Sequence, residues 1–466
     1  MGRVTAEQAA AWGGGAWTGK PPVAFNAVST DSRTVASGAL YIALKGDRFD
    51  GHDYVDAALQ AGATGAVVAE GYPNPGHDSA LLRVADTHRA LRDLAAGYRA
   101  MVAPRTIGIT GSVGKSTVKE MLAAILSRRH VTASTHGNWN NDIGLPLSLL
   151  AMDQEADYGV FEVGTNHPGE IADLCSLLRP EWGVVTNIGP SHLEFFGSES
   201  AVAHEKGELL AALPADGVAF LDADGAFYEP LRARTSARVV SVALDGAADL
   251  VVTGDVVDGD EVAVEDRRSG QTVMLPRVMP GAHQVRNLLL AAAVACEAGL
   301  AWSDIRAGLA AFEPMPMRWS CREIRDVLVI NDAYNANPVS MKAALDTFEA
   351  TPAKGRRWLV LGDMLELGGA AAEAHTALGQ CVAAGPWAGL AAVGPLSAGI
   401  AQAVRESGGA IEAVSCATAE AAGQWLSPRL SAGDAVLLKG SRGMHLETVI
   451  DVMENAGEGI DDASAT

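Results

Sequence analysis

Short apolar runs alternate with Ala-rich, amphipathic stretches along most of this chain. Near its start, the pattern predicts strands at Ala39–Leu44 and Gly65–Ala69, with a helix at Tyr54–Ala61 between them. Strands that alternate with helices in this way are typical of parallel sheets covered by helices. The hydrophobic pattern therefore predicts an α/β fold.

Proline-containing breaks divide the pattern into three parts. Pro104 precedes an apolar strand at Thr106–Thr110, and Pro314 and Pro316 mark a second linker, EPMPMR. A chain of 466 residues is expected to hold about three domains. We predict domains at 1–103, 104–315 and 316–466. Further strands are expected at Gly159–Val163, Gly183–Asn187, Val218–Leu221, Leu328–Asn331, Trp358–Gly362, Ala391–Gly394 and Ala435–Lys439, with a β-rich insert at Leu250–Leu275 and a helix at Val285–Ala298.

Composition narrows the possible function classes. The formal charge of −21 disfavours a nucleic-acid-binding protein, which needs a basic face. Five scattered cysteines without a CxxC motif indicate neither a zinc site nor a disulfide framework. The N-terminus has no apolar signal-peptide core, and the longest apolar run, Leu288–Cys296, is too short to insert into a membrane. These features predict a cytoplasmic protein.

The segment Arg105–Glu120, RTIGITGSVGKSTVKE, carries the clearest chemical signal. A strand, a glycine-rich turn and a helix start together make an anion cradle, because backbone N–H groups and the helix dipole favour a phosphate there. Lys115 adds a point charge for the β- and γ-phosphates, and Ser116 adds a hydroxyl for Mg²⁺. The strict phosphate-loop pattern places glycine where this chain has Ile109. The alternative is a glycine-rich turn with a solvated lysine. We favour ATP binding, with the cradle formed by Thr110, Gly111, Ser112, Val113, Gly114, Lys115, Ser116 and Thr117.

Several further motifs stand in a fixed order beside this loop. They are TDSRTVASGALYIALKGDRFDGH, GNWNNDIGLPLSLL, EVGTNHPGEI, NIGPSHLEFFGS, EKGE, NDAYNANPVSM, LGDMLELG and LLKGSRGMHLE. In this order, and over nearly the whole chain, the sequence resembles the Mur ligase family of ATP-dependent amide-forming enzymes in peptidoglycan precursor synthesis. The motifs YNANP and GDMLELG resemble the members of that family that add D-alanyl-D-alanine.

The resemblance implies a fold, an activity and partners. The fold would comprise a small N-terminal α/β domain that binds UDP, a central phosphate-loop domain with a mostly parallel sheet, and a C-terminal Rossmann-like α/β domain. The activity would join D-alanyl-D-alanine to a UDP-N-acetylmuramoyl-tripeptide through an acyl phosphate. The enzyme would act as a monomer, without nucleic acid or membrane insertion.

The resemblance also assigns two Mg²⁺ sites. Ser116 and Glu162 would hold the first ion, and His192 and a carbamylated Lys206 the second. The residues alone favour a loop histidine for His192 and an exposed helical lysine between Glu205 and Glu208 for Lys206. Carbamylation needs a neutral amine, so the pKa of Lys206 must fall by about three units, at a cost of roughly 4 kcal/mol.

The remaining contacts implied by the resemblance concern the nucleotide and the peptide substrates. For the nucleotide they are His283, Asn287, Arg318, Asp332, Asn335 and Asn337, with Arg318 also reaching the γ-phosphate. Lys115, Glu162, His192, Lys206 and Arg318 form the catalytic set. For the substrates they are Ser32, Arg33, Lys45, Gly46 and His52 at the UDP end, Asn138, Asn140, Asn141, Asn166 and His167 at the sugar and peptide arm, and Asp363, Lys439, Ser441 and Arg442 near the dipeptide. Each asparagine also fits a loop position with Asx-turn chemistry.

Three rival functions remain open at this point. A sister ligase that adds the third amino acid would share most motifs but carry a different one in place of YNANP. A folate polyglutamylating enzyme would lack the N-terminal domain suggested by Thr30–His52. A nucleotide-gated binding protein would need only the phosphate loop.

Overall fold

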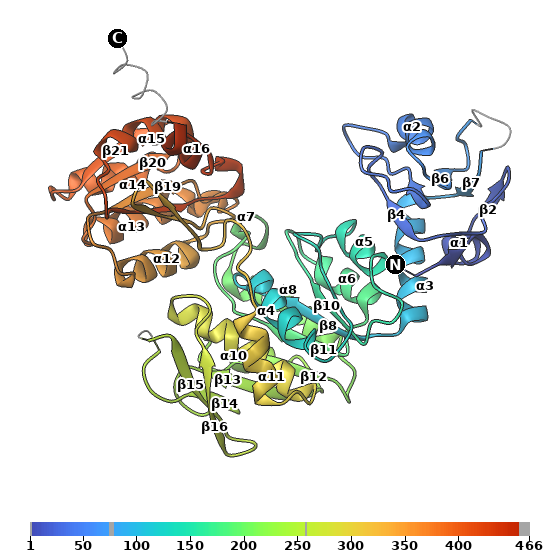
Figure 1. Ribbon diagram of the computed structural model, residues 1–466, viewed down its shortest axis with the longest axis horizontal. Helices are drawn as coiled ribbons and strands as arrows, with labels where there is room; N and C mark the ends of the chain where they lie inside the picture. Colours follow the sequence, from blue (N-terminus) through green and yellow to red (C-terminus); the bar gives the residue numbers. More distant parts are fainter. Residues whose placement is uncertain (1, 74–78, 257–258, 456–466) are drawn as a thin grey trace, which may run out of the picture.

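The computed structural model describes residues 2–73, 79–256 and 259–455, and it contains three main sheets in sequence order along the chain (Figure 1). The N-terminal sheet has the strand order β2-β7-β6-β5-β4, parallel except for β2. Its part of the chain comprises β1 (Val4–Thr5), α1 (Ala6–Gly13), β2 (Ala16–Thr18), β3 (Ala24–Phe25), β4 (Ala27–Ser29), β5 (Ala39–Ile42), η1 (Gly51–Tyr54), α2 (Val55–Gln60), β6 (Gly65–Ala69), β7 (Leu81–Val84) and α3 (Thr87–Val102).

The central sheet has nine strands in the order β16-β15-β14-β13-β12-β11-β8-β10-β9. Neighbours from β14 to β9 run parallel, whereas β14, β15 and β16 pair antiparallel. Its elements are β8 (Arg105–Thr110), α4 (Lys115–Leu126), β9 (Thr132–Ser134), α5 (Gly144–Leu150), β10 (Tyr158–Glu162), α6 (Glu170–Leu178), β11 (Trp182–Val185), α7 (Leu193–Phe196), α8 (Glu199–Ala211), β12 (Val218–Asp222), α9 (Tyr228–Arg232), β13 (Arg238–Ala243), β14 (Leu250–Val252), β15 (Glu261–Asp266), β16 (Gln271–Pro276), α10 (Ala282–Glu297) and α11 (Trp302–Ala310).

The C-terminal sheet has the order β17-β18-β22-β19-β20-β21, with only β17 antiparallel to its neighbour. Its elements are β17 (Ser320–Ile324), β18 (Val327–Asn331), α12 (Pro338–Ala350), β19 (Arg357–Gly362), η2 (Gly368–Ala370), α13 (Ala371–Ala383), β20 (Gly389–Val393), α14 (Ala398–Glu406), β21 (Glu412–Cys416), α15 (Ala419–Leu426), η3 (Ser427–Arg429), β22 (Ala435–Lys439), η4 (Arg442–Met444) and α16 (Thr448–Asn455).

The predicted α/β class and its mostly parallel sheets are confirmed. The predicted strands at Gly65–Ala69 and Ala435–Lys439 match β6 and β22, and the other predicted strands differ from the observed ones by one or two residues at their ends. The helix after the phosphate loop begins at Lys115, because Gly114 takes a left-handed conformation and ends the turn directly before it. The domain boundaries at 103/104 and 315/316 stay predictions.

Two features place the candidate site. Strand β8 lies between β11 and β10. After β8 the chain forms β9 and β10 on one side of it and then crosses to β11 on the other side, so the strand order reverses at β8. In such open sheets, ligands bind at the carboxyl ends of the strands beside this switch point. The apolar helix α10 packs against α4 behind the sheet, and its residues from Leu288 to Ala295 are all buried. This packing fixes the helix that starts at the phosphate loop.

The N-terminal part joins the central part through α3, which packs on α5. Asp86 caps the first turn of α3 by accepting from the backbone N–H groups of His88 and Arg89. The buried Tyr98 hydroxyl donates to the carbonyl of Met152 at 2.9 Å. None of the helices in the described parts of the chain combines the length and the apolar character that a bilayer crossing requires.

Candidate active site

The turn between β8 and α4 has the backbone of a phosphate cradle. Gly111 (φ 148°) and Gly114 (φ 87°) both adopt positive φ, which disfavours other residues. A Cβ on Gly111 would lie 1.9 Å from Thr186 Oγ1, and a Cβ on Gly114 would lie 2.5 Å from Asn287 Oδ1. No side chain caps the N-terminus of α4, so its first N–H groups face the cleft as donors.

Asn187, which was not predicted as a site residue, holds this turn in place. Its side-chain carbonyl accepts from Val113 N at 3.0 Å, and its amide donates to Val113 O at 2.9 Å. Its main-chain carbonyl accepts from Ser112 N at 3.0 Å. Asn187 follows β11, so the neighbouring strand fixes the loop. Asn187 is the last residue of the predicted strand Gly183–Asn187, and that position was the available signal.

A cleft of ≈ 460 Å³ lies between the central and C-terminal parts, and the phosphate loop forms one of its walls. Many predicted residues line it: Ser112, Val113, Gly114, Lys115, Ser116, Thr117, Asn138, Asn140, Glu162, Asn166, His192, His283, Asn287, Arg318, Asp332, Asn335, Asn337, Lys439, Ser441 and Arg442. The structure thus brings the predicted phosphate, metal and nucleotide residues to one cleft, except Thr110, Gly111 and Lys206, which do not line it.

Cations gather at the phosphate loop. Lys115 Nζ donates to Gly111 O at 2.7 Å, and burial lowers its pKa to about 8, with Arg318 lowering it further and Glu162 opposing the shift. Arg318 Nη2 donates to Ser116 Oγ at 3.0 Å, so an arginine from beyond the second linker reaches the loop. The guanidinium carbon lies 4.2 Å from the centre of the Tyr334 ring. Two cations and a helix N-terminus make this end of the cleft suited to a polyphosphate.

The candidate metal residues Ser116, Glu162 and His192 line the same cleft. Glu162 ends β10 and is 1% exposed, and its buried Oε1 has no hydrogen-bond partner. His192 Nδ1 lies 2.6 Å from Glu366 Oε2, and this imidazole lowers the pKa of Glu366. Among the described residues, no group of three or more His, Cys, Asp or Glu side chains could hold a metal ion. A cation here therefore needs further oxygens, which a bound nucleotide supplies.

Lys206 lies in α8 and is only 2% exposed. Burial, followed by the nearby charge of Lys115, holds its pKa well below the usual value, although Glu205 opposes this. The alternative of an exposed lysine paired with Glu205 and Glu208 is wrong. Glu205 instead accepts from Gly169 N and Ile171 N at the start of α6, and Glu208 pairs with Arg234. Lys206 does not line the cleft itself.

The predicted nucleotide residues His283 and Asn287 of α10 also line the cleft. Burial lowers the pKa of His283 to about 4, which keeps the imidazole neutral. Asn287 donates to Gln284 Oε1 at 2.8 Å, and Gln284, which carried no prediction, also lines the cleft. Neutral amides and a neutral imidazole suit the hydrogen-bonding edge of a base.

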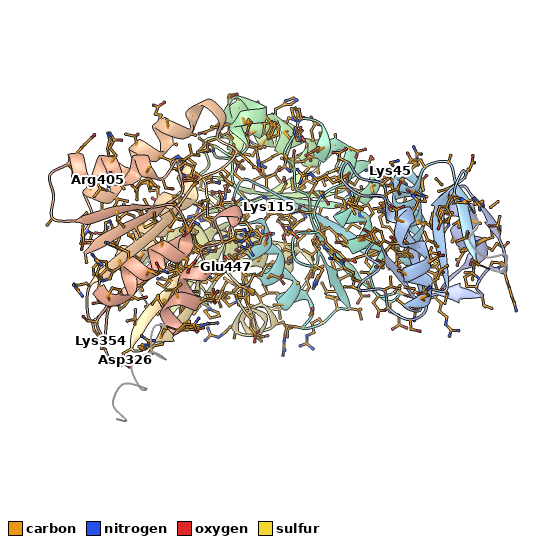
Figure 2. All side chains as sticks on the ribbon, turned by 90° about the horizontal axis from the view of Figure 1, so that it is seen from above. Lys45, Lys115, Asp326, Lys354, Arg405 and Glu447 are labelled. Atoms are coloured by element: carbon orange, nitrogen blue, oxygen red, sulfur yellow. The ribbon has the colours of Figure 1, made fainter. Side chains whose placement is uncertain are left out.

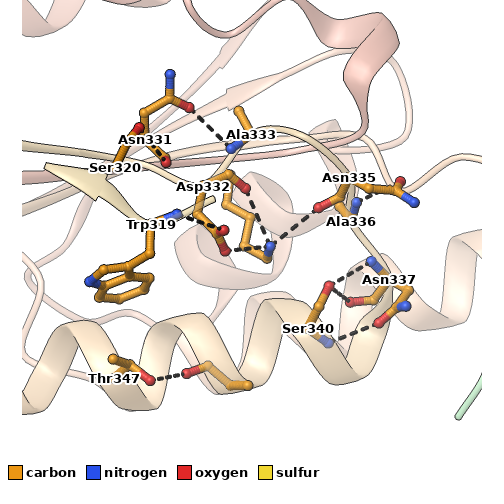
Figure 3. Close-up of polar contacts among 12 residues, drawn as sticks. Trp319, Ser320, Asn331, Asp332, Ala333, Asn335, Ala336, Asn337, Ser340 and Thr347 are labelled. Atoms are coloured by element: carbon orange, nitrogen blue, oxygen red, sulfur yellow. Dashed lines mark hydrogen bonds and ion pairs between the residues drawn. The ribbon is translucent and has the colours of Figure 1, made fainter. Parts of the chain in front are cut away.

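The loop after β18 is held by its own polar contacts (Figure 3). Asp332 Oδ1 accepts from Trp319 N at 3.2 Å, and Asp332 Oδ2 accepts from Lys439 Nζ at 2.6 Å. Asn337 caps α12 by accepting from Ser340 N at 2.8 Å, while Asn335 Oδ1 accepts from Ala336 N at 2.8 Å. The turn chemistry expected for these asparagines is confirmed, and their side chains still line the cleft.

The predicted UDP contacts lie apart from this cleft. Figure 2 shows Lys45 on the N-terminal part and Lys115 on the central part. Arg33 pairs with Asp31, and Lys45 pairs with Asp50. His52 Nε2 accepts from Ala69 N at 3.0 Å and its Nδ1 lies 2.6 Å from Asp50 Oδ1, so both ring nitrogens are engaged. Ser32 and Gly46 are at least partly exposed on neighbouring loops.

Besides the UDP contacts, three further predicted substrate contacts do not line the cleft. Asn141 caps α5 by accepting from Gly144 N at 2.8 Å, and His167 packs on the Phe195 ring at 4.3 Å. Asp363 is 2% exposed and accepts from the backbone N and the hydroxyl of Ser397, each at 2.7 Å. Its carboxylate therefore holds the start of α14 against the sheet instead of facing the cleft.

The fold and the cleft define a multidomain, nucleotide-using ligase: a phosphate loop, a buried carboxylate and an arginine from the following domain meet at one point. Three family models match the chain: the Mur ligase middle domain at 109–295, the Mur ligase glutamate ligase domain at 317–442 and the Mur ligase family catalytic domain at 24–99.

Relatives and solved structures agree with these matches. The UDP-N-acetylmuramoyl-tripeptide–D-alanyl-D-alanine ligases of Escherichia coli and Bacillus subtilis are 37% and 34% identical to this chain, covering 93% and 92% of it and 95% and 94% of their own lengths. The crystal structure of MurF from Acinetobacter baumannii matches with a TM-score of 0.87 at 31% identity, over 98% of this chain and 99% of that one. MurF ligase from Thermotoga maritima in complex with ADP matches with a TM-score of 0.79 at 28% identity, over 93% and 98%. The chain belongs to the Mur ligase family, whose members are ATP-dependent amide ligases.

Proposed function

We infer that this chain joins D-alanyl-D-alanine to a UDP-N-acetylmuramoyl-tripeptide with the conversion of ATP to ADP and phosphate. One observation carries the inference: the phosphate loop, Glu162 and Arg318 meet in a single cleft whose far wall is formed by the KGSR segment. The relatives named for this reaction match over nearly their whole length. The sister ligase and the folate enzyme fit less well, because the N-terminal sheet and the YNANP motif are both present.

The reaction proceeds by activation of a carboxylate. The terminal carboxylate of the tripeptide attacks the γ-phosphorus of ATP, ADP leaves, and an acyl phosphate forms. The amine of D-alanyl-D-alanine attacks the acyl carbon, loses a proton, and displaces inorganic phosphate to leave the amide. The chain contributes mainly by holding the reactants and neutralising charge, which for well-oriented groups lowers the barrier by about 7–11 kcal/mol.

Specific residues carry these tasks. The loop amides and Lys115 bind the phosphates, and Arg318 neutralises the charge that develops on the transferred group. His283, Asn287, Asp332, Asn335 and Asn337 bind the nucleoside. Asn138, Asn140 and Asn166 bind the sugar and peptide arm, and Ser441 and Arg442 border the dipeptide. Movement about the linker before Arg318 brings the two walls together and excludes water from the acyl phosphate.

Magnesium fits the oxygen-rich part of this cleft. Ser116 and Glu162 would hold one ion, and His192 and Lys206 would hold the second. The buried Oε1 of Glu162, which has no hydrogen-bond partner, supports this assignment. Bound magnesium would supply charge neutralisation for the phosphates. Lys206 becomes a ligand when its neutral amine adds to CO₂ and releases a proton, forming a carbamate. Its burial and lowered pKa favour the neutral amine that this step needs.

The UDP end of the substrate belongs to the N-terminal domain in this proposal. Ser32, Arg33, Lys45 and Gly46 are exposed enough to contact it, whereas His52 supports the loop from behind. In this proposal the protein works as a monomer, because its own central and C-terminal parts supply both walls of the cleft. ATP and nucleotide-linked precursors are cytoplasmic, and we place the enzyme in that compartment.

Phosphate release tests the function directly. Purified protein with ATP, Mg²⁺ and the tripeptide precursor is expected to release phosphate at a sustained rate only when D-alanyl-D-alanine is added. Diaminopimelate or lysine, offered with the dipeptide-stage precursor, serves as the matched control for the sister reaction. Phosphate release that does not depend on D-alanyl-D-alanine would overturn the assignment. Release that requires diaminopimelate or lysine with the dipeptide-stage precursor would overturn it too.

A further inference from the structure

Lys439 makes contacts that differ from those of a substrate-binding lysine. It ends β22, is 3% exposed, and its ammonium donates to three acceptors: Asp332 O at 3.3 Å, Asp332 Oδ2 at 2.6 Å and Asn335 O at 3.2 Å. An ammonium has three protons, so this set uses its full donor capacity. Figure 3 shows Asp332 and Asn335, the two residues of this loop that supply the acceptors. Lys439 thus holds the segment 332–335 in place through three hydrogen bonds.

The clamped segment in turn holds the linker on both sides of Arg318. Asp332 Oδ1 accepts from Trp319 N at 3.2 Å, and Tyr334 N donates to Met317 O at 3.1 Å. Met317 (φ 61°) and Trp319 (φ 56°) both adopt the left-handed conformation, which is costly for such side chains and persists only where surrounding contacts impose it. Asp332 and Tyr334 supply two of the contacts that hold it here, and Met317 N also donates to Ser320 Oγ at 3.3 Å.

The guanidinium of Arg318 rests on the same segment. It lies over the Tyr334 ring at 4.2 Å and donates to Ser116 Oγ at 3.0 Å. The backbone before and after Arg318, and one face of its side chain, therefore depend on residues that Lys439 holds. Displacing the segment 332–335 would move the guanidinium relative to the phosphate loop.

We propose that Lys439 is a positioning residue that sets the place of Arg318 in the cleft through the segment from Asp332 to Asn335, rather than a contact to the dipeptide. The proposal rests on the proposed function for the role of Arg318. It predicts that losing the ammonium acts on the phosphoryl-transfer step and leaves binding of the dipeptide unaffected.

The test compares Lys439→Met with a matched control. Lys342→Met removes an exposed lysine that pairs with Asp346 at 2.9 Å in the same domain and touches none of these residues. Lys439→Met is expected to lower kcat by about 10²-fold, since small misplacements of a catalytic group have effects of that size, with the KM for D-alanyl-D-alanine unchanged. Lys342→Met should leave both parameters at their wild-type values.

Coupling to Arg318 is the decisive readout. In an Arg318→Ala background, adding Lys439→Met is expected to change kcat by less than about twofold, because residues that act as one unit are non-additive. Lys439→Gln, which keeps one donor to Asp332, should recover part of the lost rate. A raised KM for the dipeptide with kcat intact, or two full and independent effects in the double variant, would overturn the proposal.

Amide hydrogen exchange gives a readout that does not need catalysis. In the ligand-free protein, Lys439→Met is expected to speed exchange in peptides that cover 317–335, while peptides from the N-terminal sheet keep their wild-type rates. Unchanged exchange in 317–335 would count against the clamp. If wild-type protein itself shows no dipeptide-dependent phosphate release, the proposed function fails, whereas the exchange result still decides whether Lys439 holds the linker.

Discussion

Two lysines of the central domain are almost fully buried, yet their surroundings are opposite. Lys119 in α4 is 0% exposed, donates to Thr135 O at 2.7 Å, and has carboxylates of Glu120 and Glu162 at 2.6 Å and 3.9 Å. Lys206 in α8 is 2% exposed and has no hydrogen bond or ion pair among the described residues, with the cation of Lys115 nearby instead.

The difference shows that the charged and polar groups beside a buried lysine, more than its burial, decide its role. The Lys119 ammonium contacts one carbonyl and two carboxylates, and its ion pair with Glu162 ties α4 to β10. A buried amine with a like charge beside it is driven toward its neutral form, which can react with CO₂. The contacts of Lys119 therefore serve to stabilise the fold, whereas the surroundings of Lys206 favour the neutral amine that the proposed carbamate needs.

The largest expected effect is at Lys206. Lys206→Ala should lower kcat by about 10²–10³-fold, the usual loss when one preorganised charged group is removed from a transition state. Added short-chain carboxylic acids should restore part of the rate, because they can occupy the place of the carbamate. Steady-state phosphate release measures both. Full activity in the variant, or no rescue by any acid tried, would remove the carbamate from the account.

Lys119→Met should act on stability instead. Removing the cation takes the ion-pair partner Lys119 away from the buried carboxylate of Glu162, and we expect unfolding to become easier by about 3 kcal/mol. Urea denaturation followed by circular dichroism gives this value. Carboxylic acids should not rescue any accompanying loss of activity. A variant as stable as wild type, or one rescued by acids, would break the contrast between the two lysines.

The pH dependence of stability sharpens the contrast further. Because the pKa of Lys206 is lower in the folded than in the unfolded protein, the unfolded chain binds more protons between the two values, and stability rises with pH across that window. In CO₂-free buffer, wild type should therefore gain stability over Lys206→Met by up to about 1.4 kcal/mol per pH unit as pH approaches 10.5. Parallel urea curves at several pH values measure this difference. A gap that stays constant would contradict the lowered pKa.

The smallest effect is expected at Glu120, the partly exposed partner of Lys119. Glu120→Gln should cost no more than about 1 kcal/mol, since solvent screens the pair and Thr135 O and Glu162 remain beside the ammonium. Thermal unfolding of the two proteins side by side is sufficient to detect it. A loss as large as that of Lys119→Met would mean that Glu120, and not the buried surroundings, carries the structural role.

The parts of the site that follow from backbone chemistry could be predicted from the sequence. The glycine turn, Lys115 and Ser116 lie next to one another in the chain, and the strand before them is unmistakably apolar. Glu162 and Asn187 lie at or next to the carboxyl ends of predicted strands, and parallel strands bring these ends to one edge. Local sequence was enough because the relevant geometry is set within one strand–turn–helix unit and its neighbours.

Other properties depend on packing that no local pattern records. EKGE reads as a solvated helical surface, and only the position of α8 under the sheet buries Lys206. Asp363 and His52 stand in motifs with the right residue types, yet their side chains turn to Ser397 and to Ala69 N. Lys119 gave no signal because a lysine inside an amphipathic helix is normally exposed. Side-chain direction and the choice of partner are fixed by the tertiary structure.

The account's central claim is that the cleft activates a carboxylate by phosphorylating it. Tripeptide precursor labelled with ¹⁸O in its terminal carboxylate tests this directly, because the oxygen that attacks the γ-phosphorus leaves with the phosphate when the amide forms. The account predicts one ¹⁸O atom in the inorganic phosphate released with D-alanyl-D-alanine, measured by mass spectrometry or by the ³¹P isotope shift. Phosphate that carries no label, released together with the amide product, would contradict it.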